Sequence, residues 1–326
     1  AHKQKMSNLI SGHVSNFEID YEFPIKKGFY WQEAFNHPKA GISFLYGGLG
    51  NAKELGIGTA LYGFLRFPLI TKQRFMFSYK WGSGLGVISK PFHSEKNYKN
   101  VAIGSTLNMF MHVSLEGRFL LSNKLSLSTG LGYSHYSNGA FKMPNLGINI
   151  PDFRIGVSYQ IGDAKEIKLP EYDSSLTARN WEYSFFGAYS LKEVYPAGGI
   201  KYQVFHFEGD IMKRVDEKRK IGLGFDVYHD ASTLDEYNHD YPENKSDNGM
   251  EFVRYGIHFS HELVFGRFSA ITQFGVYLHT KYKGDGPIYH RFAYRYYFDP
   301  HVFVDVGLKT HWGTAQNLAI GIGYKI

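Results

Sequence analysis

Residues 181–191 read WEYSFFGAYSL, and their character changes at every second position. The odd positions hold Trp, Tyr, Phe, Gly, Tyr and Leu, whereas the even positions hold Glu, Ser, Phe, Ala and Ser. A period of two is typical of a β-strand with one apolar face and one small or polar face. Residues 125–135 (LSLSTGLGYSH) and 302–312 alternate in the same way, over more residues than most globular strands need. The chain is therefore expected to be all-β.

The composition also favours many twisted strands joined by tight turns. The 326 residues include 25 Tyr, 27 Phe and 36 Gly, but only 11 Pro. No stretch approaches the roughly 18 apolar residues of a membrane helix, which excludes a helical membrane protein. A transmembrane barrel needs only strands of roughly 9 to 11 residues with an apolar outer face. It is therefore compatible with a mean hydropathy of -0.31. The absence of Cys excludes a disulfide framework.

Turns of alternating length separate the predicted strands. Short turns are expected at 68–71, 122–123, 265–266 and 299–300, and long polar loops at 89–103, 137–150 and 232–249. Short turns at one rim and long loops at the other are the arrangement of outer-membrane barrels. We therefore predict an antiparallel transmembrane β-barrel of the bacterial outer membrane with about 14–16 strands. The predicted strands lie near 12–23, 39–48, 55–68, 72–88, 104–121, 124–136, 151–162, 180–194, 198–213, 219–231, 250–265, 268–281, 288–298, 301–312 and 316–325.

A polar stretch divides the predicted strands nearly in half. We interpret residues 1–162 as a first barrel half, 163–180 as a polar periplasmic connection and 181–326 as a second barrel half. Seven predicted strands precede the connection and eight follow it, so the alternative is two tandem eight-stranded units. The first residues, AHKQK, are interpreted as a mature or trimmed N-terminus.

The charge balance bears on the partners of the chain. The net charge is +6 and the pI is about 9.0, which implies affinity for anions. Because acidic and basic residues are interspersed, a nucleic-acid partner is not expected, and anionic lipid fits the balance equally well. The acidic and amide-rich segment 229–248 has the residue types of a cation site, but its spacing matches no known binding loop and favours a solvated external loop.

A His and a Ser close the strand predicted at 124–136. His135 and Ser137 continue the odd, apolar register of that strand, so both are expected to point outward toward lipid at the rim of long loops. A Ser hydroxyl becomes a nucleophile when a neighbouring imidazole takes its proton. Residues two apart on a strand share a face, with Cα atoms roughly 6.5 to 7 Å apart. On the residues alone, the pair indicates either a hydrolase or only the polar end of a strand.

The longer segment HYSNGAFKMPNLGIN (135–149) resembles the active-site segment of PagL-type lipid A 3-O-deacylases, an acyloxyacyl hydrolase-like family. The pattern of that family reads HYSN, small residues, Lys, a residue, PN, a residue, Gly, Ile and Glu. The resemblance places His135 at the catalytic His and Ser137 at the nucleophile. It implies an outer-membrane barrel that removes the 3-O acyl chain of lipid A in lipopolysaccharide, at its lipid-facing surface and without cofactor or metal. The other matching positions are Asn138, Lys142, Pro144, Asn145, Gly147 and Ile148.

One position departs from the family pattern. Asn149 stands where the family has the Glu that orients the His. An amide oxygen accepts a hydrogen bond from imidazole Nδ1–H, but it offers no charge to stabilise the imidazolium. Asp152 is the alternative acid, and its register places it on the other face of the strand.

The resulting hypothesis assigns a role to each residue of the segment. Ser137 is the nucleophile, His135 is the base and then the acid, and Asn149 orients the imidazole. The oxyanion candidates are Asn138, Asn145 and the backbone of Gly139. Lys142 is a candidate contact for lipid phosphates. The rival hypothesis is a catalytically inactive homologue that acts as a pore or as a structural barrel.

Overall fold

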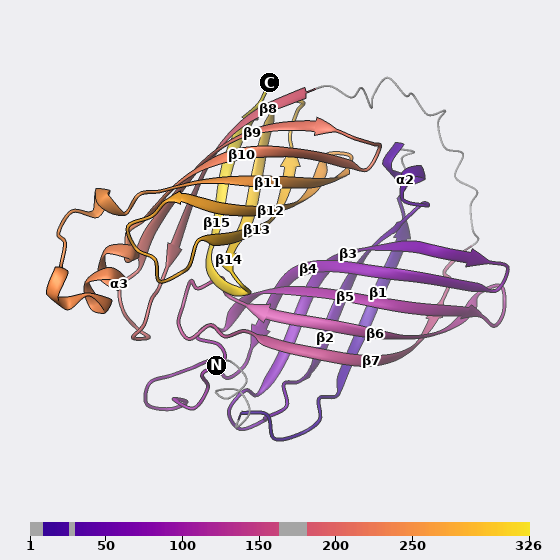
Figure 1. Cartoon of the computed structure of the whole chain (residues 1–326). Helices are drawn as coiled ribbons and strands as arrows, with labels where there is room; N and C mark the ends of the chain where they lie inside the picture. Colours follow the sequence, from indigo (N-terminus) through magenta and orange to yellow (C-terminus); the bar gives the residue numbers. More distant parts are fainter. Residues whose placement is uncertain (1–8, 26–29, 163–180) are drawn as a thin grey trace. The chain divides into compact units, whose positions relative to one another are not determined.

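Antiparallel strands make up nearly all of the fold (Figure 1). The computed structural model describes residues 9–25, 30–162 and 181–326, which belong to two compact units. The connection predicted at 163–180 lies outside the described residues. Within the described residues, no helix has both the length and the apolar character of a membrane span.

The first unit is a sheet of seven strands in sequential order, β1 to β7, and each strand pairs with the next in antiparallel register. The helix α2 (Tyr30–Ala34) lies between the first two strands. The strands are β1 (Asn16–Pro24), β2 (Lys39–Gly48), β3 (Ile57–Lys72), β4 (Phe75–Ile88), β5 (Leu107–Leu120), β6 (Leu125–Ser137) and β7 (Ile148–Tyr159).

The second unit is a closed barrel of eight strands, in which β15 pairs with β8. Between β10 and β11 lie α3 (Ser232–Asp240), η2 (Pro242–Asn244) and η3 (Gly249–Phe252), within the segment predicted to be an external loop. The strands are β8 (Trp181–Lys192), β9 (Tyr202–Arg214), β10 (Arg219–Asp230), β11 (Arg254–Phe265), β12 (Phe268–His279), β13 (Ile288–Tyr297), β14 (Val302–His311) and β15 (Thr314–Lys325).

The all-β antiparallel prediction is confirmed, and each of the predicted strands overlaps an observed one. The hydrogen-bonded order gives two sheets, so the topology follows the tandem alternative and not one barrel of 14–16 strands. Among the strands that the structure describes, seven form the first sheet and eight close the second, which accounts for the odd total. The physical reason is the pairing of the strands. In the first sheet, backbone hydrogen bonding between neighbouring strands stops at β7, and β8 pairs with β9 and β15 instead, which closes the second sheet into a barrel.

The turn predicted at 68–71 is wrong. Strand β3 continues through these residues to Lys72, and its register with β4 shifts between Pro68 and Ile70. Proline donates no backbone hydrogen bond, and a bulge takes up such a residue without ending the strand. The chain reverses at residues 73–74 instead.

Charged side chains line the inner face of the first sheet. Lys80 Nζ lies 2.7 Å from a carboxylate oxygen of Glu18. On β7, an Arg154 guanidinium nitrogen lies 3.2 Å from the same Glu18 oxygen. These ion pairs connect β1 with β4 and β7, so the sheet curls with its polar side chains inside. The opposite face carries exposed apolar side chains, among them Leu131 and Phe153. Such an exposed apolar face is the arrangement that a lipid-facing surface requires.

Candidate active site at the end of strand β6

The register of β6 and β7 determines which residues share the outer face of the first sheet. Along β6, residues at odd positions are the more exposed ones from Leu125 to Tyr133, and even positions turn inward. His135 and Ser137 continue the odd series, and His135 lies directly opposite Asn149 of β7. The three side chains named by the sequence as nucleophile, base and orienting group therefore belong to one face of one strand pair.

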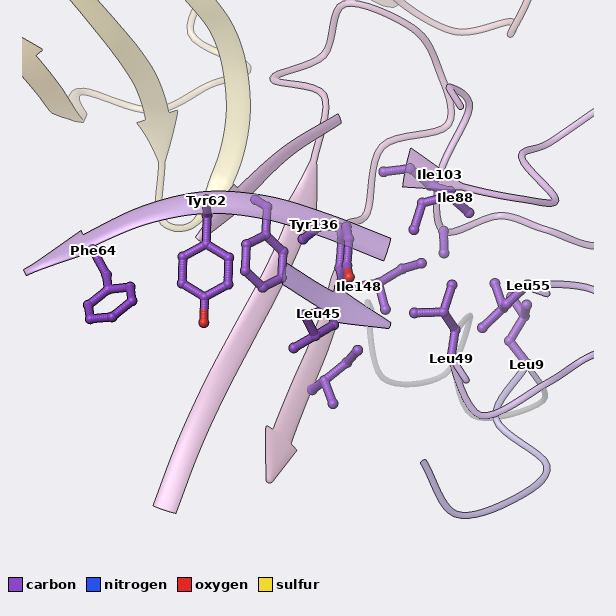
Figure 2. Packing of buried hydrophobic residues seen from close by; sticks show 14 residues of the cluster. Leu9, Leu45, Leu49, Leu55, Tyr62, Phe64, Ile88, Ile103, Tyr136 and Ile148 are labelled. Carbon is purple, nitrogen blue, oxygen red and sulfur yellow. The ribbon is translucent and has the colours of Figure 1, made fainter. Parts of the chain in front are cut away.

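Inward-facing neighbours anchor this strand end. Tyr136 and Ile148 belong to a buried apolar cluster with Tyr62, Phe110 and Leu49 (Figure 2). Tyr136 is 0% exposed and lies between His135 and Ser137 in the chain. Because strand side chains alternate, burial of Tyr136 and Ile148 directs His135, Ser137 and Asn149 to the opposite face.

The imidazole of His135 is held by an amide. His135 Nδ1 lies 2.5 Å from Asn149 Oδ1. The amide oxygen can only accept, so Nδ1 carries the proton in this hydrogen bond and Nε2 presents a lone pair. This tautomer is the one that a general base requires. Asp152 lies elsewhere, because its carboxylate is 2.9 Å from Arg154 Nε on the inner-facing register of β7.

Gly147 lies against the imidazole ring. A Cβ at this position would lie 2.6 Å from His135 Cε1, and the backbone has φ +75°. The Gly147 N–H donates to Ala102 O at 3.1 Å, so the loop 89–106 holds this backbone in place. Only glycine meets both the steric and the conformational requirement.

We expect Gly147→Ala to lower the activity of the candidate site by about 10²-fold, because displacing a reacting group by about 1 Å has an effect of this order. Rates of ester hydrolysis by the purified variant and by the wild type measure the loss. Gly162→Ala is the matched control, since Gly162 also has positive φ (+77°) and no atom of the described residues lies within 4 Å of its added Cβ. Equal losses in both variants would attribute the effect to backbone strain and not to contact with His135.

The side-chain amide of Asn145 contacts the hydroxyl of Ser137. Asn145 Nδ2 lies 3.1 Å from Ser137 Oγ as a donor, and Asn145 Oδ1 lies 3.3 Å from the same oxygen as an acceptor. Asn145 Oδ1 also accepts from the Asn138 backbone N–H at 3.0 Å. The Asn138 side chain donates to Ser105 Oγ at 2.7 Å. The backbone N–H and the side-chain amide of Asn138 both donate to other residues of the loops, whereas the Asn145 side-chain amide donates to Ser137 Oγ. Asn145 is therefore the better placed of the two for an oxyanion.

The remaining candidates lie in the loop after Asn138. Gly139 has φ +62°, and Lys142 is exposed. Both belong to the segment 139–143, which is part of the second compact unit. Their roles in the oxyanion site and in phosphate contact stay predictions.

A second Ser and His pair was not predicted from the sequence. His112 Nδ1 lies 3.0 Å from Ser134 Oγ on the inner face of β5 and β6. Both side chains are buried, and the rings of Tyr62 and Phe110 lie within 5.7 Å and 6.5 Å of the imidazole. The pair could have been predicted only from the alignment of β5 with β6, which places His112 opposite Ser134. Because both side chains are buried, we interpret His112 and Ser134 as a pair that stabilises the fold, and we use it as a control for His135 and Ser137.

Comparisons with known proteins follow the division of the chain. Residues 15–158 match the sequence model of "Lipid A 3-O-deacylase (PagL)", and residues 181–326 match that of "Acyloxyacyl hydrolase, C-terminal domain". No curated protein matches the chain.

Membrane barrels are among the solved structures that are similar to this chain. A de novo designed transmembrane β-barrel has 12% identity, covers 45% of this chain and 95% of its own, and has a TM-score of 0.27. KdgM porin has 8% identity, 95% and 98% coverage, and a TM-score of 0.20. An outer membrane channel from Pseudomonas putida F1 has 10% identity, 97% and 95% coverage, and a TM-score of 0.22. TM-scores this low do not show a common overall fold.

Proposed function

The chain belongs to the lipid A 3-O-deacylase (PagL) family, and from this premise we propose that it hydrolyses an ester-linked acyl chain of lipid A at the outer face of β6. Membership of this family makes the chain a bacterial outer-membrane protein with hydrolase chemistry. The substrate would then be lipopolysaccharide in the outer leaflet, and the bond cleaved would be the 3-O acyl ester.

The observation that carries the proposal is the His135–Asn149 hydrogen bond, which fixes the basic tautomer two residues from Ser137. In the reaction, His135 Nε2 takes the proton of Ser137 Oγ as the oxygen attacks the ester carbonyl. The Asn145 amide donates to the developing oxyanion. His135 then gives its proton to the departing sugar oxygen, and water hydrolyses the acyl-serine to release the fatty acid and regenerate Ser137.

The location of the pair suits a lipid substrate. The side chains that precede it on the same face of β6, Leu131 and Tyr133, are exposed and apolar or amphipathic. His135 and Ser137 lie at the last residues of the strand, at the rim where the loops 89–106 and 138–147 begin and end. Polar side chains on a lipid face cost least near the membrane interface. An ester near the head group of a lipid would meet the pair at this depth.

A pore is the rival function, and the second barrel does not favour it. An eight-stranded barrel has an interior just wide enough for side chains to fill. Inside β8 to β15, Arg291, Arg295 and Asp305 are buried and paired with one another. These buried ion pairs occupy part of the interior and disfavour an aqueous channel.

Mass spectrometry of lipid A tests the proposed function. Lipid A from cells that express the protein should lose the mass of one hydroxyacyl chain, compared with cells that carry the empty vector. The purified protein with lipopolysaccharide in detergent should release the corresponding free fatty acid. Identical lipid A in both strains, with the barrel present and folded in the outer membrane, would contradict the proposal.

We expect Asn149→Glu to raise activity about three- to fivefold, because a carboxylate adds charge stabilisation of the imidazolium, worth up to about 1 kcal/mol in an exposed pair. Asn149→Leu removes the acceptor and should lower activity by at least about tenfold, since Nδ1–H then loses its partner. Rates of fatty acid release by the three proteins measure both effects. Full activity in Asn149→Leu would show that Asn149 does not orient His135.

A further inference from the structure

The interior of the second barrel holds an unusual group of carboxylates and imidazoles. His206 and Glu208 are two residues apart on β9 and point inward, and Asp226 lies directly opposite Glu208 on β10. All three side chains are buried. Like charges directly opposite on neighbouring strands repel each other, and burial away from water strengthens the repulsion. The pair Glu208 and Asp226 therefore needs a positive charge between its carboxylates.

The side-chain atoms converge on one point. His206 Nε2 lies 2.7 Å from Asp226 Oδ1 and 3.7 Å from Glu208 Oε2. One ligand atom from each of the three residues lies within 4.8 Å of the other two. Within the part of the chain that the structure describes, neither oxygen of Glu208 accepts a hydrogen bond, although the side chain is inaccessible to solvent. Buried carboxylates normally accept hydrogen bonds, so Glu208 has acceptor capacity that the protein does not use.

The neighbouring cations lie closer to other carboxylates than to Glu208. Arg291 and Arg295 lie 3.7 Å from Glu208 oxygens, but both guanidiniums make closer contacts with Asp305. His258 lies between two other carboxylates, with Nδ1 2.5 Å from Asp226 and Nε2 2.9 Å from Asp210, and as an imidazolium it donates to both. Glu208 is therefore the carboxylate of this group whose nearest cationic side chains, among the described residues, are 3.7 Å away.

We propose that the second barrel binds a divalent transition-metal ion of the zinc class through His206 Nε2, Glu208 Oε2 and Asp226 Oδ1. Imidazole and carboxylate donors are the ligands such ions take, with bonds of about 2.0 to 2.2 Å. A tetrahedral ion at that distance separates its ligand atoms by roughly 3.4 Å. The His206–Glu208 separation of 3.7 Å is close to this value, whereas His206 and Asp226 are hydrogen-bonded at 2.7 Å and would move apart by roughly 0.7 Å as the ion replaces the shared proton. A water or a neighbouring side chain fills the fourth position.

Surrounding groups orient one ligand for this role. The second oxygen of Asp226 accepts from His258 Nδ1 at 2.5 Å and from the Tyr289 hydroxyl. Hydrogen bonds to the free atom of a ligand are the usual support of a metal site. The imidazole of His206 stacks on Tyr228, with ring centroids 4.1 Å apart, which fixes the direction of Nε2.

Refolding with and without metal tests this site. The full chain is refolded in detergent with chelator-treated buffer and either no metal or Co²⁺, because cobalt reports its coordination through visible absorption. We expect one Co²⁺ per chain with a tetrahedral spectrum, displaced by Zn²⁺, and a higher unfolding temperature of the loaded protein. Failure of the wild-type protein to retain Co²⁺ or Zn²⁺ would overturn the proposal.

Two variants separate this site from surface binding. Glu208→Gln keeps the shape and removes the ligand charge, so we expect metal affinity to fall at least tenfold. His279→Gln is the control, since His279 is an exposed histidine at the end of β12, and it should leave affinity unchanged. The difference in mobility between boiled and unboiled samples in electrophoresis shows that each variant is folded. If Glu208→Gln does not fold, His206→Gln replaces it. Equal affinity in wild type and a folded ligand variant would contradict the assignment.

Discussion

Ser137→Ala is expected to abolish deacylation, with a loss in kcat/KM of at least about 10³-fold, because no other group forms the acyl intermediate. The variant should still fold, since Ser137 ends β6 and its removal leaves Tyr136 packed in the apolar cluster. Lipid A from cells expressing the variant should keep the acyl chain that the wild type removes. Release of free fatty acid by the purified protein gives the rate.

Ser134→Ala is the matched control for this substitution. Ser134 lies three residues earlier on the same strand, but its hydroxyl contacts His112 on the inner face. Both variants remove one hydroxyl from β6, so a general effect on the strand would appear in both. Loss of activity in Ser134→Ala with full activity in Ser137→Ala would move the catalytic site to the inner face and overturn the proposed mechanism.

The strands were predictable because one period of two runs through nearly all of them. From Leu125 to Tyr133 the odd positions of β6 are exposed and the even positions are half-buried, as the alternation in LSLSTGLGYSH indicates. The division into two sheets was less predictable, since the ladder that closes a barrel joins strands far apart in the sequence. The pairing of β15 with β8 carries no local signal, because any two apolar strands satisfy the same alternation.

The sequence predicted which residues of the segment 135–149 form the candidate site, but not the contacts that these residues make with other segments. His135, Ser137 and Asn149 were placed on one face by register and by resemblance, and the structure brings His135 and Asn149 into contact. The contact of Asn138 with Ser105 was not predictable, because the loop 89–106 returns to the site without a regular pattern. Pairing of His112 with Ser134 depends on the alignment of β5 with β6, and a shift of one residue would have separated them.

The cluster in the second barrel was missed for the same reason. His206, Glu208 and Asp210 alternate along β9, which indicates a polar inner face. Only the pairing of β9 with β10 places Asp226 opposite Glu208. An alternating strand thus shows which side chains point inward, whereas the cross-strand register decides which of them meet.

His135→Ala is expected to lower kcat/KM by at least about 10³-fold, because the Ser137 hydroxyl then has no base. The truncation leaves a space beside Gly147 and Asn149, which free imidazole can enter. Added imidazole should therefore restore part of the activity of His135→Ala, measured as fatty acid release. It should restore none in Ser137→Ala, where the base is present and the nucleophile is missing.

The double variant decides whether the two residues act together. If His135 activates Ser137, combining Ser137→Ala with His135→Ala should cost little more than either single change, because each alone already removes the nucleophilic pathway. Two residues that contributed independently would instead give a loss equal to the product of the single losses. His112→Ala, which removes the inner imidazole, should show no gain from added imidazole. Rescue there, or independent losses in the double variant, would show that His135 is not the base of Ser137.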